Sequence, residues 1–165
     1  MSALPASVNI REVGPRDGFQ NEPEVIPTDD KIRLIGLLGA SGLRRIEVTS
    51  FVRADVIPQL ADASAVLDAV RLPPSVAVSV LIPNERGLER ALRHRERFQE
   101  INGFLSASET HNTKNVGRSI EESLTGLKRT FARALEAGLR CEGVLTVSFL
   151  SLIHISEPTR QAEIS

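Results

Sequence analysis

The chain has 165 residues, of which 41% are hydrophobic, and its formal net charge is -1 at pH 7. This composition predicts one globular domain and argues against a general attraction to nucleic acid or anionic membranes. The single cysteine, Cys141, excludes an intramolecular disulfide, and no apolar run approaches the roughly 18 residues that span a bilayer. Because residues 1–7 also lack a secretory signal pattern, the expected compartment is the cytoplasm.

The first expected element is a short strand over residues 8–13, where apolar and polar residues alternate. Gly14-Pro15 ends this strand, and a dense polar segment follows at residues 16–22. This segment has two interpretations. It is either a charged surface loop or part of an active site built at the carboxyl end of a strand.

A helix is expected from Thr28, as N-cap, to Ala40, with Gly42 as its end. A second strand then covers residues 43–50 and carries Glu47 in an apolar setting. A carboxylate is costly in such a strand unless it is paired. Its partner could be a neighbouring arginine of its own strand, but we expect an interaction with Arg16.

The middle of the chain continues the alternation of helices and strands. A helix is expected over residues 54–70, a strand buried on both faces over 76–82, and a charged helix over 85–94. His94 stands between two arginines, which favours a solvated helix face.

A fourth strand is expected over residues 98–107, followed by a polar loop at 108–115 that contains His111 and Lys114. Ser119 and Glu122 form a predicted capping box for a helix that ends at Gly138, and a fifth strand covers 139–149. Strands that alternate with helices in this way predict a parallel α/β sheet. The first strand carries neither a dinucleotide fingerprint nor a P-loop.

Several segments in order resemble the 3-hydroxy-3-methylglutaryl-CoA (HMG-CoA) lyases. These segments are Gly-Pro-Arg-Asp-Gly-Phe-Gln-Asn-Glu at 14–22, Ile-Glu-Val-Thr-Ser-Phe-Val at 46–52, Ile-Pro-Asn at 82–84, and parts of 108–123. The resemblance implies a (β/α)8 TIM barrel, a fold that typically needs about 250 residues. The expected structure is therefore an incomplete barrel with about five strands and four helices, whose open strand edges favour aggregation or pairing.

The resemblance also implies roles for particular residues. Asp17 would bind a divalent cation (Mg²⁺ or Mn²⁺), and Gln20 would lie near the substrate. Arg16 and Glu47 would be catalytic: Arg16 would contact the carbonyl or enolate oxygen of the acyl-CoA substrate, and Glu47 would be a carboxylate that acts in catalysis or orients Arg16. Lys114 would either meet a CoA phosphate or lie on the surface. The full-length form would be a homo-oligomer in leucine degradation, without nucleic-acid or membrane partners.

The remaining parts of the family's site are missing from this chain. The family's other metal ligands, a His-x-His pair and an asparagine, come from later strands, and no His-x-His occurs here. The catalytic cysteine also comes from a later loop, so its role does not pass to Cys141. His111 has no neighbour at metal-ligand spacing. The chain as it stands is therefore predicted to be inactive.

The last residues follow a different pattern. Residues 150–165 resemble a translated sequencing adapter, so the expected domain covers residues 1–149 and the tail is expected to be non-native. Two alternative functions stay open. One is a related Claisen-type lyase or synthase of the same barrel superfamily, and the other is a non-catalytic protein that binds an acyl-CoA or a partner.

Overall fold

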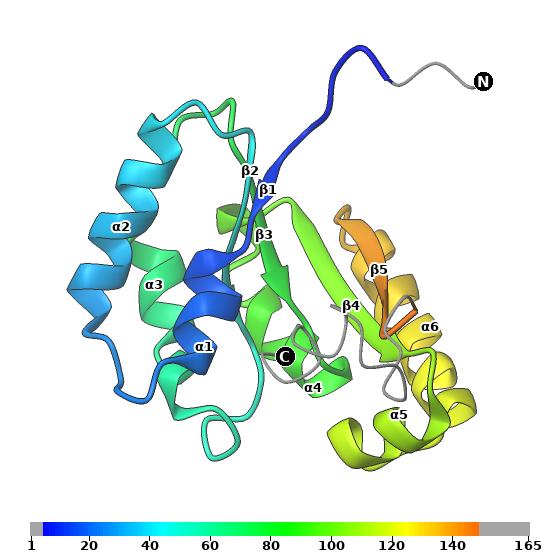
Figure 1. Ribbon diagram of the computed structural model, residues 1–165. Coiled ribbons are helices and arrows are strands. Elements are labelled where there is room, and N and C mark those ends of the chain that lie inside the picture. The colour runs from blue at the N-terminus through cyan, green and yellow to red at the C-terminus, as the bar shows by residue number, and fades with distance from the viewer. Residues whose placement is uncertain (1–4, 149–165) are drawn as a thin grey trace.

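The computed structural model describes residues 5–148 and contains one parallel sheet of five strands in the order β1-β2-β3-β4-β5 (Figure 1). The strands are β1 (Arg11–Glu12), β2 (Arg45–Ser50), β3 (Ala77–Leu81), β4 (Glu100–Ser106) and β5 (Arg140–Thr146). Each strand pairs in parallel with the next one along the chain. The predicted incomplete TIM barrel is confirmed, and β1 and β5 form the two ends of the described sheet.

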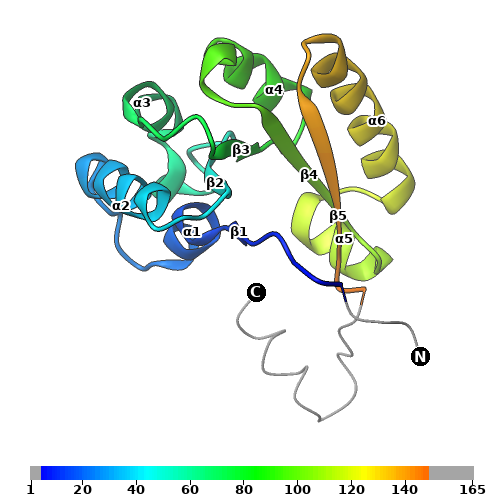
Figure 2. The same ribbon diagram turned by 90° about the horizontal axis from the view of Figure 1, so that it is seen from above.

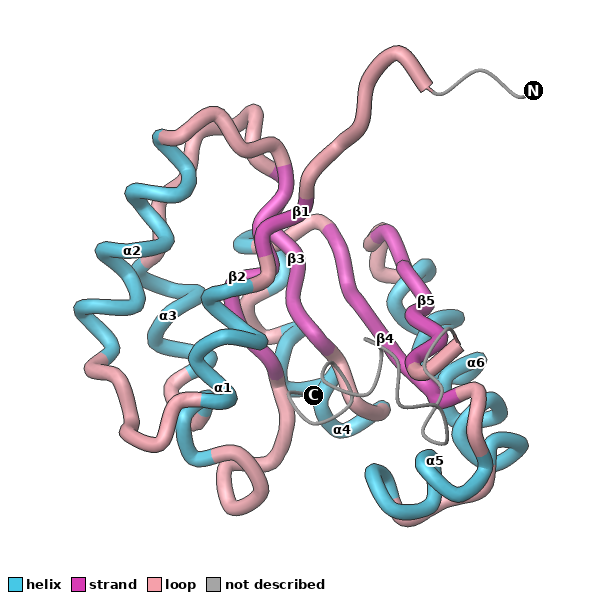
Figure 3. The backbone as a smooth tube through the Cα atoms, viewed as in Figure 1, coloured by secondary structure: helices cyan, strands magenta, loops and turns pink. Residues whose placement is uncertain are grey.

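Helices connect successive strands and lie mainly on one side of the curved sheet (Figures 2 and 3). The α-helices are α1 (Phe19–Asn21), α2 (Thr28–Ala40), α3 (Ala63–Ala69), α4 (Glu85–Leu92), α5 (Glu109–Val116) and α6 (Ile120–Glu136). Three short turns complete the set: the π-helical η1 (Gly14–Gly18) and the 3-10 segments η2 (Pro58–Leu60) and η3 (Arg95–Arg97). None of the helices in residues 5–148 is long and apolar enough to cross a membrane.

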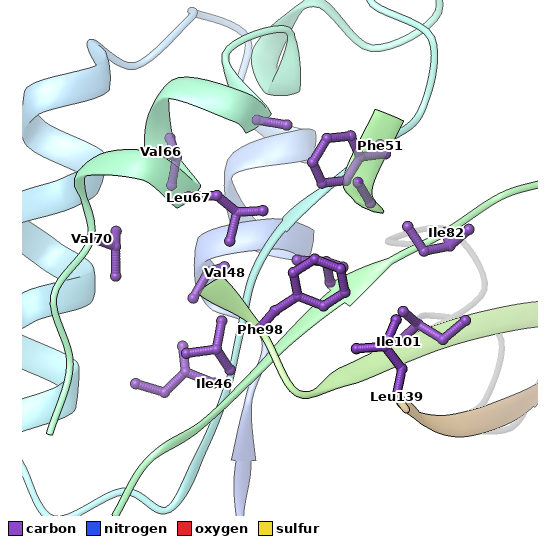
Figure 4. Packing of buried hydrophobic residues seen from close by; sticks show 14 of the residues in the cluster. Ile46, Val48, Phe51, Val66, Leu67, Val70, Ile82, Phe98, Ile101 and Leu139 are labelled. Carbon is purple, nitrogen blue, oxygen red and sulfur yellow. The ribbon is translucent and has the colours of Figure 1, made fainter. Parts of the chain in front are cut away.

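The two faces of the sheet differ in chemistry. On the helix side, Ile46, Val48 and Ile101 are almost fully buried and pack with side chains of α3 and with Phe98 (Figure 4). The residues between these along each strand carry polar side chains. The opposite face of the sheet therefore holds Glu47 of β2 and the polar residues paired with it on the neighbouring strand. Because successive side chains of a strand point to opposite faces, one sequence pattern produces both an apolar core and a polar interior.

Three predicted elements differ from the structure. The predicted helix over 54–70 is divided into η2 and α3, and the predicted strand over 8–13 is reduced to β1. The predicted polar loop over 108–115 is the helix α5, because the Ser108 side chain accepts a hydrogen bond from the His111 backbone N–H at 3.3 Å. This N-cap stabilises a helix that has little apolar pattern of its own.

Two predicted details of the helices are also wrong. Thr28 is the first residue of α2 and not its cap, and its hydroxyl donates a hydrogen bond to Asp62 at 2.7 Å. His94 is not on a solvated face, because its ring lies between Asp68 and Ser64 of α3, at 2.7 and 3.1 Å. The capping box of Ser119 and Glu122, in contrast, is confirmed.

The contact between β4 and α6 depends on Gly103. A Cβ atom at this position would lie 2.4 Å from a methyl group of Leu127 and 2.9 Å from the Phe131 ring. We therefore expect Gly103→Ala to lower the free energy of unfolding by about 1–3 kcal/mol, the usual effect of overpacking. Gly36→Ala is the matched control, because nothing lies within 4 Å of its new Cβ in the middle of α2. Urea unfolding followed by circular dichroism measures both, and equal stability of the two variants would contradict the expectation.

Candidate active site

Arg16 and Asp17 are positioned by the turn that follows β1. The backbone N–H groups of both residues donate to the carbonyl of Val13, at 3.0 and 2.7 Å, which winds residues 14–18 into η1. The Glu12 carboxylate accepts a hydrogen bond from the Gly14 N–H at 2.6 Å. The segment is thus a tight helical turn fixed by its own backbone, which holds the two charged side chains at the carboxyl end of β1.

Glu47 is the buried centre of the site. Its side chain is 0% exposed, and Oε1 accepts a hydrogen bond from Arg16 Nε at 2.5 Å. The other oxygen, Oε2, accepts from Asn102 Nδ2 at 2.8 Å and lies 4.0 Å from Arg11 Nη1. The expected contact between Arg16 and Glu47 is confirmed, whereas Arg45 of the same strand binds other carboxylates. Two cations and an amide offset the cost of burying this charge.

Asp17 and Gln20 lie at the outer side of the same turn. The Asp17 side chain is 52% exposed, and Oδ1 lies 2.6 Å from Arg16 Nη1. Gln20 follows in α1 and is half-buried. Within residues 5–148, no three His, Cys, Asp or Glu side chains are grouped so that they could hold a metal ion. Asp17 by itself would give a divalent cation fewer oxygen ligands than Mg²⁺ or Mn²⁺ favours.

The structure adds an ion-pair network that the sequence reasoning missed. Arg45 binds Glu100 at 2.8 Å and Glu142 at 2.7 Å, and these two carboxylates raise the pKa of the Arg45 guanidinium. Glu142 also binds Arg11 at 2.7 Å, which connects this network to Glu47. The signal in the sequence was the recurrence of Glu100 and Asn102 at every second position of an otherwise apolar strand. That spacing places both side chains on one face.

Two polar atoms beside Glu47 lack a hydrogen-bond partner among the described residues. They are the buried Oδ1 of Asn102 and the buried Nη1 of Arg11. Buried polar groups in native proteins nearly always have a partner, which can be water or a ligand. The face around Glu47 is therefore suited to a further polar group that donates to Asn102.

The other candidate residues lie away from this face. Cys141 is on the helix side of β5, where its thiol lies 3.8 Å from the Phe131 carbonyl, and burial raises the pKa of this thiol. A raised pKa lowers the thiolate fraction, which does not suit a reactive cysteine. His111 is half-buried in α5, and Lys114 is exposed on the same helix.

Residues 7–156 match the HMGL-like family model, which extends beyond the predicted boundary at residue 149. The sequence is 46% identical over 145 residues to hydroxymethylglutaryl-CoA lyase YngG of Bacillus subtilis, covering 88% of this chain and 48% of that protein. The crystal structure of a Bacillus subtilis HMG-CoA lyase superposes with a TM-score of 0.86 at 43% identity, covering 97% of this chain and 54% of that one. An Acinetobacter baumannii HMG-CoA lyase in complex with coenzyme A and 3-methylmalate gives 0.83 at 33% identity, with 99% and 53% covered. The chain spans about half the length of the relatives it matches. The predicted non-native tail, residues 150–165, lies outside the described residues.

Proposed function

Because this chain belongs to the HMGL-like family, we propose that it is the N-terminal half of a lyase that cleaves 3-hydroxy-3-methylglutaryl-CoA to acetyl-CoA and acetoacetate. The observation that supports this most is the hydrogen bond between the fully buried Glu47 and Arg16, which belongs to the family-like segment after β1. An acyl-CoA substrate agrees with the coenzyme A in the Acinetobacter baumannii structure. We also propose a cytoplasmic location and a homo-oligomeric full-length form.

The reaction requires a cation near a developing negative charge. A base removes the proton of the C3 hydroxyl, the C2–C3 bond breaks, and the electron pair passes into the enolate of acetyl-CoA, which is then protonated on carbon. We assign Arg16 to the enolate or carbonyl oxygen. Its Nε is held by Glu47 and one Nη by Asp17, so its orientation is set before substrate arrives. A charge that needs no rearrangement during the reaction is an effective form of transition-state stabilisation.

Glu47 has the role of a positioning residue in this proposal. Both of its oxygens accept hydrogen bonds from the protein, from Arg16 and from Asn102. It therefore orients Arg16, and Gln20 in the next turn is the proposed neighbour of the substrate. Asp17 is the proposed single ligand that this half contributes to a divalent cation, whose remaining ligands would come from outside the described residues.

A chimaeric enzyme tests the proposal directly. Residues 1–148 would replace the matching N-terminal half of the Bacillus subtilis relative, and acetoacetate release from the substrate would be measured. We expect saturable, metal-dependent cleavage by the chimaera. We expect none by the 165-residue chain alone, because in this proposal the chain carries only part of the active-site residues. A folded chimaera without cleavage would refute the proposed activity, and cleavage by the chain alone would refute the proposed division of the site.

A further inference from the structure

Lys31 of α2 is a charged side chain that is buried away from the ion pairs around Glu47. Its side chain is 2% exposed, and its ammonium group donates to both carboxylate oxygens of Asp62, at 2.8 and 2.9 Å. Asp62 directly precedes α3 and also accepts a hydrogen bond from the Thr28 hydroxyl at 2.7 Å. A buried charge is costly unless it is paired and hydrogen-bonded, so this ion pair joins the start of α2 to the start of α3.

Lys31 makes a third hydrogen bond, which the contact between the two helices does not require. Its ammonium group donates to the backbone carbonyl of Gln59 at 2.5 Å, and Gln59 lies in η2, between β2 and α3. Hydrogen bonds from a charged donor are roughly twice as strong as those between neutral groups. The backbone at Gln59 is therefore fixed by a buried cation.

The side chain of Gln59 reaches the segment that carries Arg16. Its amide nitrogen donates to the Glu22 carbonyl at 2.8 Å, where α1 ends and the backbone becomes extended. α1 lies beside the segment that joins β2 to α3 (Figure 1). Within residues 5–148, this is the one hydrogen bond between the backbone of residues 14–22 and a later part of the chain.

The turn of residues 14–22 is thus held at two points. At its start, the Val13 carbonyl accepts hydrogen bonds from the N–H groups of Arg16 and Asp17. At its end, the Gln59 amide holds the Glu22 carbonyl. A displacement of about 1 Å in a reacting group is enough to slow a reaction by up to 10²-fold, so the second point of attachment bears on catalysis.

Resting on the proposed function, we propose that Gln59 is a positioning residue of the active site and that Lys31 is its buried anchor. Lys31 holds the backbone of Gln59, and the amide of Gln59 holds the end of the turn that carries Arg16 and Gln20. Neither residue acts on the substrate itself.

A purely structural role makes a different prediction. If the buried cation only held α2 against α3, the ion pair of Lys31 with Asp62 would be sufficient, and the amide of Gln59 would be dispensable. Gln59→Met separates the two roles. It removes the donor to Glu22 but keeps the length of the side chain and the backbone carbonyl that Lys31 binds.

Hydrogen–deuterium exchange of the 165-residue chain, measured by mass spectrometry, is the first test. We expect Gln59→Met to speed amide exchange in residues 13–22 by about tenfold, the effect of losing one hydrogen bond that opposes local opening. Gln59→Lys keeps an N–H donor and is expected to exchange at the parental rate. Gln99→Met is the matched control, because it removes a hydrogen bond of 2.9 Å to the Val78 N–H at the amino end of β3.

Kinetics of the chimaera are the second test. Gln59→Met is expected to lower kcat by about tenfold with a smaller change in KM, because a displaced Arg16 stabilises the enolate less well. Gln59→Lys is expected to restore kcat, and the Gln99→Met control is expected to retain it. A merely structural contact would lower stability in both methionine variants and would leave the kcat of the folded enzyme unchanged.

Three results would overturn the proposal. The first is equal exchange of residues 13–22 in the parent chain and in Gln59→Met, and the second is equally faster exchange in Gln99→Met. The third is a chimaera that cleaves substrate with the same kcat whether or not it carries Gln59→Met. If the chimaera does not cleave at all, the proposed function fails, whereas the exchange rates still decide whether Gln59 fixes the turn. The two proposals therefore fail separately.

Discussion

Glu47→Gln is expected to lower the free energy of unfolding by about 3 kcal/mol or more. The substitution removes the buried charge beside Arg16 and Arg11, whose side chains are 14% and 18% exposed, and leaves them only the more exposed Asp17 and Glu142 as partners. Removing one partner of a buried ion pair costs about 3–5 kcal/mol, far more than loss of a surface pair. The same size and shape of glutamine keep the packing unchanged, so the effect reports on the charge.

The chimaera with a complete barrel is the suitable protein for this measurement, by urea unfolding followed by circular dichroism. Glu89→Gln is the control, since it removes an exposed carboxylate that pairs with Arg133 on the helix side. We expect that control to match the parent protein within error. A Glu47→Gln variant as stable as the control would show that this carboxylate does not hold the polar face together.

Arg16→Gln in the chimaera is expected to reduce kcat by about 10²–10³-fold, the typical effect of removing one group that stabilises a developing oxyanion. Arg16→Lys is expected to recover little of this activity. A lysine offers one compact ammonium group, whereas Arg16 donates to Glu47 and Asp17 through different nitrogens of a planar fork.

Kinetics of acetoacetate release distinguish this role from a structural one. A group that acts in the transition state changes kcat and kcat/KM together, whereas a group that only binds substrate changes mainly KM. Arg33→Gln on the exposed face of α2 serves as the control for the loss of one positive charge. If Arg16→Gln raises KM and leaves kcat unchanged, Arg16 binds the substrate but does not stabilise the enolate.

The parts of the fold that were predicted correctly share one property, which is a strong local signal. The apolar runs of β2 and β3 and the capping box at Ser119 identified strands and a helix without knowledge of their neighbours. α5 was missed because its helical state depends on the Ser108 cap and on Asn112. The buried Asn112 side chain donates to the carbonyls of Arg118 and Ser119. Both of these carbonyls lie beyond the end of α5, so the sequence pattern of the helix itself does not reveal the hydrogen bonds.

In the candidate site, too, the contact with a local signal was predicted and the contacts without one were missed. The contact between Arg16 and Glu47 was predicted because a charge inside an apolar strand requires a partner, which is a matter of local chemistry. Asn102 and Arg11 were not predicted as partners of Glu47, although both lie within 4.0 Å of it. They come from β4 and β1, and nothing in their own segments indicates which strand they face.

The sequence by itself determined the order of strands and helices, the parallel sheet and the family, because hydrophobic periodicity and short motifs are read along the chain. Only the tertiary structure decided which side chains meet: Asn102 with Glu47, His94 with Asp68, and Glu85 of α4 with Arg129 of α6. The physical reason is that burial and ion pairing depend on distances in space. A register of parallel strands and the packing of helices on them set those distances between residues far apart in sequence.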